Sequence, residues 1–382
     1  MADMLRRFLW KVCRLIYLYI AKPILFRISP DNVHNAMIKF TIVVGKVPLL
    51  RLFVGLIFVG RHNERLAQTL HGIKFNVPVG LSAGFDKNGE ITPAIAALGF
   101  GFETVGSVTA KQCNGNPRPW FYRLPKTQAT VVNAGLGNDG SRAVIKRLSG
   151  YSSNALKCLP VVLSIAKTNS RDTVDIKTGI ADYVTTAKRA KRAKSIQMIE
   201  LNISCPNAHG GEPFTTPSRL ELLLSAVDKV ELTQPVYVKM PVDLPWVTFR
   251  GLLDVINLHH VAGVTIANLI KDRSLVELKD NLPDTVKGNL SGKPTWQPSN
   301  DLIRQTYLYC GDKLTIIGVG GIFSADDAYT KIKLGASLVE LITGMLFVGP
   351  QLAAEISDGL SLLLKRDGYT NISQAIGVEA NK

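Results

Sequence analysis

A buried strand followed at once by polar residues is the repeating pattern of this chain. It is clearest in the stretch Ile196-Gln197-Met198-Ile199-Glu200-Leu201-Asn202-Ile203-Ser204-Cys205-Pro206-Asn207. Its apolar beginning is typical of a buried strand, and polar side chains follow where that strand should end. Two amides, Asn202 and Asn207, bracket the thiol of Cys205. An amide offers both a donor and an acceptor, so the pair suits a flat ligand edged with NH and C=O groups, and the thiol can move a proton. An ordinary strand end followed by turn residues would look the same.

The pattern of an apolar run followed by a helical stretch recurs from Gly72 onward. The predicted strands are Val77–Leu81, Phe102–Val105, Leu159–Ile165, Ile196–Asn202, Val236–Met240, Gly263–Ala267, Thr315–Val319 and Leu338–Ile342. Eight strand–helix units in about 270 residues favour a (β/α)8 barrel, with a doubly wound open sheet as the alternative. We therefore expect a helical extension at residues 1–71 and a barrel with a short C-terminal tail at residues 72–382.

Polar residues cluster directly after the predicted strands, where a barrel of this class carries its functional groups. Besides the amides and thiol above, they are Lys87, Gly106, Ser107, Thr109, Ser164, Lys167, Lys239 and Asn268. Glycines follow the last two strands, as Gly318-Val319-Gly320-Gly321 and Thr343-Gly344. Backbone N–H groups at this place form the usual phosphate site of such barrels, although a tight turn would also need glycine. The residues predict a phosphorylated planar cofactor, and no metal-ligand set is evident.

The composition is that of a globular protein. Of the 382 residues, 46% are hydrophobic and 20% charged, which is ordinary for a domain with a large core. Five scattered cysteines without CxxC spacing argue against a disulfide framework or a zinc cluster, and favour a reducing compartment. The net charge is +15. The basic run Lys188–Lys194 is most simply a solvated helix end, where the helix dipole favours cations; nucleic-acid binding is the less favoured interpretation.

The N-terminal region is apolar and basic. Residues Met1 to Leu70 contain eleven Lys and Arg against three acids. Charges interrupt the apolar segment Phe8–Phe26, which argues against a bilayer-spanning helix and favours an amphipathic helix among lipid headgroups. A helix start is predicted at Ser29-Pro30-Asp31, and further apolar elements at Ala36–Val44 and Leu49–Val59. These helices could pack on the barrel or dip into a membrane. We favour the membrane, because so few polar positions are left to face water, and no cleaved signal peptide is predicted.

Several motifs together resemble those of the dihydroorotate dehydrogenases, which are barrel enzymes of pyrimidine biosynthesis that use flavin mononucleotide (FMN). The motifs are Ala83–Glu90, Asn116–Pro119, Asn202–Asn207, Asn289–Pro294 and Ile316–Ile322. The resemblance runs from about Ser29 to the end of the chain. The helical extension resembles that of the membrane-associated class, which passes electrons to a quinone. Ser29–His34 is similar to the mouth of that class's quinone tunnel, and Arg123 to an arginine at its inner end.

The resemblance implies a role for each candidate residue. It places the FMN phosphate on Gly320, Gly321, Thr343 and Gly344, the ring system against Ala83 and Gly84, and further cofactor contacts on Lys87, Ser107, Ser164, Asn202, Lys239 and Gly292. Dihydroorotate would be bound by Asn133, Asn202, Asn207 and Asn268, with Lys87 near its carboxylate. Cys205 would be the base that removes the C5 proton while hydride leaves C6, and Lys239 would face the pyrimidine edge of the flavin. His34 and Arg123 would lie on the quinone side.

Some positions depart from the membrane-associated class. Cys205 replaces its usual serine, Ser164 replaces an asparagine, Ile342 replaces a tyrosine of the quinone pocket, and the segment Asn133–Asn138 is one residue shorter. A thiol is easier to deprotonate than a hydroxyl, so we expect the proton step to work. The electron acceptor is less constrained than the substrate: the alternatives to quinone are fumarate, or NAD reached through a partner subunit.

Two other functions fit parts of the sequence. A related flavin barrel could reduce uridine in tRNA with Cys205 as the acid, or the chain could be a non-catalytic membrane-binding barrel. The expected partners are dihydroorotate or orotate, a membrane quinone and an anionic lipid surface, with no nucleic acid and no metal. We expect a peripheral membrane protein at the cytoplasmic face of a bacterial inner membrane, with the mitochondrial inner membrane as the alternative.

Overall fold

Eight parallel strands close into a barrel in the computed structural model, which describes residues 2–60, 63–156 and 159–382. They are β3 (Val79–Leu81), β4 (Phe102–Val108), β7 (Val161–Ile165), β8 (Met198–Asn202), β9 (Val236–Met240), β10 (Gly263–Ile266), β12 (Thr315–Val319) and β13 (Leu338–Leu341). Their spatial order is β10-β12-β13-β3-β4-β7-β8-β9. The predicted (β/α)8 barrel is therefore confirmed, and the alternative of an open sheet is wrong.

All eight predicted strands are present, and only their ends differ. The largest difference is in β4, which continues to Val108 instead of ending at Val105. The pairing of β4 with β7 shifts register between Val105 and Val108, and Gly106 has a φ of 119° there. A side chain at Gly106 would lie 2.7 Å from the carbonyl oxygen of Ser164. A glycine is therefore needed where this strand bulges toward the site.

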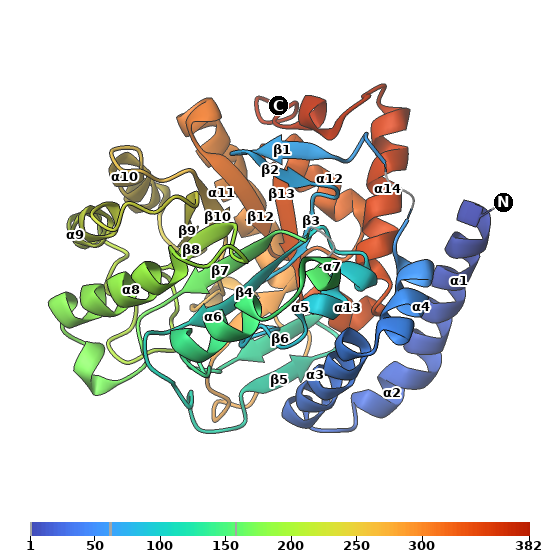
Figure 1. The fold of residues 1–382 in the computed structure, drawn as a ribbon, viewed down its shortest axis with the longest axis horizontal. Helices are drawn as coiled ribbons and strands as arrows, with labels where there is room; N and C mark the ends of the chain where they lie inside the picture. The colour runs from blue at the N-terminus through green and yellow to red at the C-terminus, as the bar shows by residue number, and fades with distance from the viewer. Residues whose placement is uncertain (1, 61–62, 157–158) are drawn as a thin grey trace.

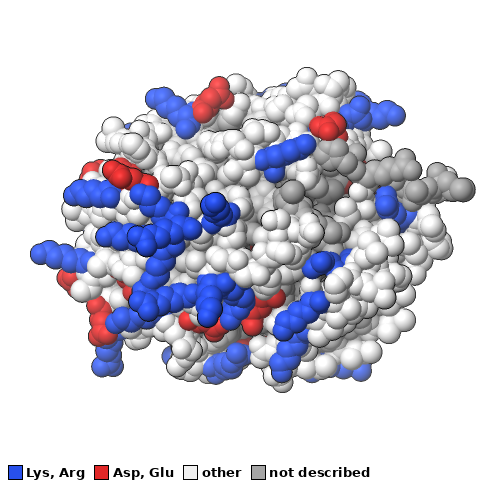
Figure 2. Space-filling model, in the orientation of Figure 1, with Lys and Arg blue, Asp and Glu red and all other residues white. Residues whose placement is uncertain are grey.

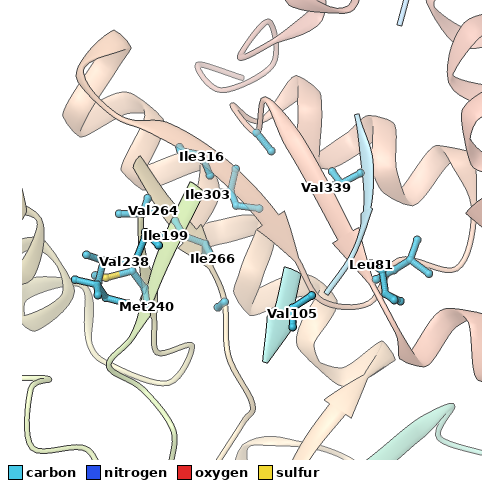
Figure 3. Packing of buried hydrophobic residues seen from close by; sticks show 14 of the residues in the cluster. Leu81, Val105, Ile199, Val238, Met240, Val264, Ile266, Ile303, Ile316 and Val339 are labelled. Carbon is cyan, nitrogen blue, oxygen red and sulfur yellow. The ribbon is translucent and has the colours of Figure 1, made fainter. Parts of the chain in front are cut away.

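A ring of helices covers the outside of the barrel (Figure 1). Its helices are α5 (Thr92–Ile95), α6 (Ser141–Ser149), α7 (Ser153–Leu156), α8 (Ile176–Ala190), α9 (Pro217–Asp228), α10 (Trp246–Ile256), α11 (Trp296–Cys310), α12 (Ala325–Lys333), α13 (Thr343–Val348) and α14 (Leu352–Arg366). Buried strand residues such as Val238, Val264 and Ile316 share one core with Ile303 of α11, as Figure 3 shows. Each fully buried aliphatic side chain contributes about 1.5–3 kcal/mol of hydrophobic free energy.

A hairpin of two short strands lies at the amino end of the barrel. It consists of β1 (Gln68–Leu70) and β2 (Ile73–Phe75), and the proposed division between residues 71 and 72 falls in its turn. The ring of Phe75 meets that of Phe102 edge-on, with centroids 5.5 Å apart. A second apolar cluster fills this end of the barrel, made of Phe75, Phe102, Val162, Met198, Tyr237, Ile317 and Leu338. The amino end is therefore closed by apolar side chains.

A second, antiparallel sheet lies over the other end of the barrel and was not predicted. It has the order β11-β6-β5 and consists of β5 (Phe121–Leu124), β6 (Ala129–Val132) and β11 (Asn289–Gly292). We call this sheet the roof. Its strands have only four residues each and lie in polar loops, so their pairing depends on contacts between distant segments and not on a local pattern.

The N-terminal helices pack along one side of the barrel, at the right of Figure 1. They are α1 (Ala2–Ile16), a π-helical turn at Tyr17–Ala21, α2 (Lys22–Leu25), α3 (Pro30–Lys46) and α4 (Pro48–Phe58). Helix α3 begins at Pro30, directly after Ser29, as predicted. Arg7 forms an ion pair of 2.9 Å with Asp358, and the Tyr17 hydroxyl donates to the Leu346 carbonyl at 2.6 Å. Polar contacts thus hold the extension on the barrel.

The outer face of these helices is apolar and exposed. Of the 28 large hydrophobic side chains that are exposed among the described residues, 19 lie between Met4 and Val59. Phe40 is 63% exposed and Phe53 is 60% exposed. Within the described residues, no one helix has the length and hydropathy to cross a membrane; α3 and α4 together pass that test as a pair bent by 104°.

The basic run Lys188–Lys194 ends α8, as predicted. Lys188 and Arg189 occupy the last turn of this helix, and Figure 2 shows Lys and Arg side chains gathered over this part of the surface. Four of the five cysteines, Cys13, Cys113, Cys205 and Cys310, are free thiols; the fifth lies outside the described residues.

Candidate active site

A cavity of about 240 Å³ opens at the carboxyl ends of the strands, between the barrel, the roof and α3. Most of the candidate residues from the sequence line it: His34, Ala83, Gly84, Lys87, Ser107, Arg123, Asn202, Cys205, Asn207, Lys239, Asn268, Gly292, Gly320, Gly321, Thr343 and Gly344. Asn133 and Ser164 do not line it; Ser164 contacts a lining residue directly, and Asn133 is joined through Asn116 to the lining residue Asn207. The Ser164 hydroxyl lies 2.9 Å from that of Ser107, and the Asn133 side-chain oxygen accepts from Asn116 at 2.9 Å.

Hydrogen bonds fix the orientation of the amides that line the cavity. Asn202 donates its side-chain N–H to the Ser107 hydroxyl at 2.8 Å, and its oxygen accepts from Asn268 at 3.1 Å. Asn268 also donates to the carbonyl of Ser204 at 2.8 Å. Because each amide is held by its neighbours, donors and acceptors face the cavity in a fixed pattern.

Two asparagines that the sequence offered only as parts of motifs orient the rest of the site. Asn289 of the roof donates to the side-chain oxygen of Asn207 at 2.7 Å. Asn116 donates both to Asn133 and to the backbone carbonyl of Asn207, the latter at 3.1 Å. No strand or helix pattern marks these positions, so only the tertiary structure reveals that they support the cavity.

The Cys205 thiol is half-buried at the cavity wall, close to two lysines. Burial raises its pKa to about 11, although the backbone N–H of Asn207 and the ammonium groups of Lys167 and Lys239 act in the opposite direction; Glu212 adds to the rise. The thiol is therefore protonated near neutral pH, and the ease of deprotonation expected from the sequence is offset by burial. The thiolate, which is the form of Cys205 that can act as a base, is populated mainly at high pH or when a ligand changes the groups around the sulfur.

Ion pairs fasten the loop that carries Cys205. Glu212 lies 2.7 Å from the Lys271 ammonium, and Lys271 also lies 3.3 Å from Asp243. From the other side, Lys167 donates to the carbonyl of His209. These contacts tie the loop after β8 to the loops after β7, β9 and β10, so the thiol keeps a fixed place at the rim.

Lys87 joins the cavity to the N-terminal helices. Its ammonium donates to the Gly84 carbonyl at 2.8 Å and lies 3.4 Å from Nε2 of His34 on α3. Burial lowers the pKa of Lys87 to about 8, while Asp86 opposes that shift. Burial, together with Lys87 and Arg118, lowers the pKa of His34 to about 3. His34 is therefore neutral at pH 7 and can accept a hydrogen bond from Lys87.

The first turn of α3 is fixed to the roof. Asp31 is buried, forms an ion pair of 2.6 Å with Arg118, and accepts from the backbone N–H groups of Trp120 and Phe121 at 3.1 and 3.3 Å. Arg123 of β5 donates to the carbonyls of Leu25 and Ile28 at the end of α2. The cavity therefore has one wall of helical extension and one wall of barrel.

The opposite wall can hold a phosphorylated flavin. Gly320 and Gly321 have φ angles of 110° and 68°, and a side chain at Gly321 would lie 2.3 Å from Trp296. This backbone can approach a phosphate closely. Lys239 is buried and lines the cavity, and its charge acts on the nearby carboxyl of Glu340. A buried ammonium at the cavity wall suits an electron-rich ligand, and the reducible edge of a flavin is such a group.

The described residues contain no cluster of His, Cys, Asp and Glu that could hold a metal ion.

Comparisons with known proteins agree with this architecture. A family model described as "Dihydroorotate dehydrogenase" matches residues 65–364. A relative named dihydroorotate dehydrogenase (quinone) from Haloarcula marismortui is 34% identical over 360 residues, covering 94% of this chain and 98% of the relative. A relative of the same name from Mycolicibacterium smegmatis is 37% identical over 312 residues, covering 82% and 85%. A crystal structure titled DHODH in complex with ferulenol, from Eimeria tenella, aligns with a TM-score of 0.82 and 27% identity over 92% of this chain and 96% of that one.

Proposed function

Because this chain belongs to the dihydroorotate dehydrogenase family, a family of flavoproteins, we propose that it oxidises dihydroorotate to orotate with FMN and passes the electrons to a membrane quinone. The observation that carries the proposal is the single cavity that joins Cys205 and Lys239 to His34 on the N-terminal helices. The names of the relatives include the quinone. They do not favour the alternatives of fumarate, NAD or tRNA uridine.

The first part of the proposal concerns the substrate and assigns a role to each polar group. Asn202, Asn207 and Asn268 hydrogen-bond the N–H and C=O groups of the dihydroorotate ring, and the Lys87 ammonium attracts its carboxylate. Asn133 acts through Asn116, which holds Asn207 in place. Cys205 removes the proton from C5 of the ring, and its raised pKa in the free protein makes this proton transfer sensitive to pH.

The second part of the proposal concerns the cofactor, which would lie against the glycine-rich wall of the cavity. The glycines Gly320, Gly321 and Gly344 with Thr343 would hold the phosphate of FMN, and Lys239 would face the edge of the ring on which negative charge develops. When bound, FMN accepts the hydride that leaves C6 of the substrate. Lys239 stabilises that charge, and the buried surroundings exclude water from it.

The third part of the proposal concerns the quinone, which would accept electrons between the helical extension and the barrel. His34 and Arg123 line this side of the cavity, and the exposed apolar face from Met4 to Val59 would sit among lipids with its Lys and Arg near anionic headgroups. Peripheral attachment to a membrane follows, and we place it at the cytoplasmic face of a bacterial inner membrane, with the mitochondrial inner membrane as the alternative.

Anaerobic titration of the purified flavin-loaded protein tests the proposal. Dihydroorotate should bleach the flavin absorbance. When ubiquinone, menaquinone, fumarate and NAD are then tested as acceptors, the absorbance should return with the quinones and not with fumarate or NAD. A flavin that stays oxidised in excess dihydroorotate would refute the substrate. Reoxidation by fumarate or NAD at the quinone rate would refute the acceptor.

A further inference from the structure

A layer of four polar side chains crosses the interior of the barrel beneath the cavity. In an eight-stranded barrel, each interior layer takes one residue from every second strand, and these are usually bulky aliphatic residues. Here the strands β4, β8, β10 and β13 contribute Thr104, Glu200, Thr265 and Glu340. All four side chains are buried, with at most 1% of each exposed. We call these four residues the polar layer.

The neighbouring layers show how unusual the polar layer is. The layer on the amino side consists of Gly80, Val162, Tyr237 and Ile317, which belongs to the apolar closure of the barrel. The layer on the carboxyl side consists of Ser82, Ser164, Lys239 and Val319, three of which line the cavity. Glu340 also reaches the cavity lining. The polar layer therefore lies directly under the groups that face the proposed flavin.

Most polar atoms of this layer have no hydrogen-bond partner among the residues that the structure describes. Neither carboxyl oxygen of Glu200 has one within the described residues, and the same holds for Oε2 of Glu340 and the Thr265 hydroxyl. The other oxygen of Glu340 accepts from the Thr104 hydroxyl. Two buried carboxylates with so few donors cannot both keep a full negative charge, because burial and mutual repulsion favour the neutral form.

The charges around the pair set how many protons it keeps. Burial and the neighbouring Glu200 raise the pKa of Glu340, and Lys239 acts against them. Lys239 on β9 is the charged group that faces the pair from the carboxyl side, and Tyr237, on the same strand, is the titratable group on the amino side. The facing residues on β3, β7 and β12 are Ser82, Ser164 and Val319. One cation beside two carboxyls stabilises one negative charge and not two.

We propose that Glu200 and Glu340 share one proton and hold a single negative charge under Lys239, and that this charge lowers the reduction potential of the flavin. The proposal rests on the proposed function only in taking a flavin as the ligand of Lys239. Lys239 alone would stabilise the reduced, negatively charged ring strongly; a negative charge behind it weakens that stabilisation. The pair thus acts on the cofactor through Lys239, as a positioning element and not as a catalytic one.

Glutamine substitutions test the pair, because an amide replaces a protonated carboxyl with little change of shape and carries no charge. The midpoint potential of the flavin is measured by dye equilibration in Glu200→Gln, Glu340→Gln and the double variant. Each single variant still holds one negative charge and should stay close to wild type at pH 7. The double variant loses the charge, so its potential should rise. Glu277→Gln, in a surface loop, serves as the charge-matched control.

The pattern of shifts distinguishes the possible charge states. Equal additive rises in the two single variants would mean two negative charges and overturn the shared proton. A wild-type potential in the double variant would mean no charge and overturn it as well. Infrared spectra give a second check: the band of buried protonated carboxyls should be present in the wild-type protein and should lose the intensity of one carboxyl in Glu340→Gln, while the buried Glu103 contributes equally to both. Since neither readout uses dihydroorotate, failure of the substrate assignment leaves this test intact.

Discussion

The two ends of the same barrel have opposite interiors. At the amino end, Phe75, Phe102 and Tyr237 belong to a closed apolar cluster. At the carboxyl end, Lys239, Asn202 and Cys205 line an open polar cavity. Tyr237 and Lys239 lie on one strand, only two residues apart. Residues that stabilise the core and residues that face the cavity can therefore lie on the same strand, two positions apart, because every second side chain points into the barrel. Substitutions at the two ends should have separable effects.

The largest expected effect comes from Cys205→Ala at the carboxyl end. Removing the proposed base should slow flavin reduction by dihydroorotate by about 10²–10⁴-fold, measured by anaerobic stopped-flow absorbance. Flavin content and the free energy of unfolding should stay near wild type, because the thiol makes no core contact. Wild-type reduction in this variant would remove Cys205 from the mechanism.

Phe102→Ala tests the amino end. Deleting a fully buried aromatic ring should cost about 3–5 kcal/mol of unfolding free energy, measured by denaturant titration. The rate of flavin reduction per folded molecule should not change. A loss of rate without a loss of stability would show that the two ends are not independent.

The pH dependence sharpens the assignment of the carboxyl end. Since burial raises the pKa of Cys205 to about 11, the reactive thiolate fraction should grow about tenfold per pH unit below that value. The rate of flavin reduction should therefore climb through the alkaline range, and Cys205→Ser should lose this profile. A rate that is already constant above pH 7 would contradict a thiol base with a raised pKa.

Phe53→Glu extends the comparison to the helices beside the cavity. This exposed side chain of α4 should contribute about 1.5–3 kcal/mol to membrane partition, so its replacement should weaken binding to anionic vesicles at least about tenfold. Flavin reduction by dihydroorotate in detergent should be unaffected. Leu258→Glu, which is exposed near α10, is the matched control; equal loss in both variants would move the membrane contact away from α4.

The smallest effect is expected on the outer helices. His259 lies 2.9 Å from Glu221 and 2.7 Å from Asp228. Burial lowers the pKa of His259, but these two carboxylates outweigh burial and the net pKa is raised. The protonated form therefore stabilises the fold below about pH 6.5, and this stabilisation is lost as the pH rises through the raised pKa. His259→Asn should flatten the pH dependence of the melting temperature without changing activity.

The sequence predicts the barrel because the barrel strands are short, mostly apolar runs that end at a polar rim. It predicts the cavity because barrels place functional groups at that rim. The roof was missed, since β5, β6 and β11 pair only through contacts between distant segments. The polar layer was missed although Glu200 stands in the opening stretch. One charged residue in an apolar run does not reveal that Glu340, 140 residues later in the chain, shares its interior layer.

The hydrogen bonds from Trp120 and Phe121 to Asp31 have a mechanical consequence. They connect the first turn of α3 to the roof, so the proposed membrane attachment of α3 and α4 would place the bilayer in mechanical contact with the sheet that orients Asn207 through Asn289.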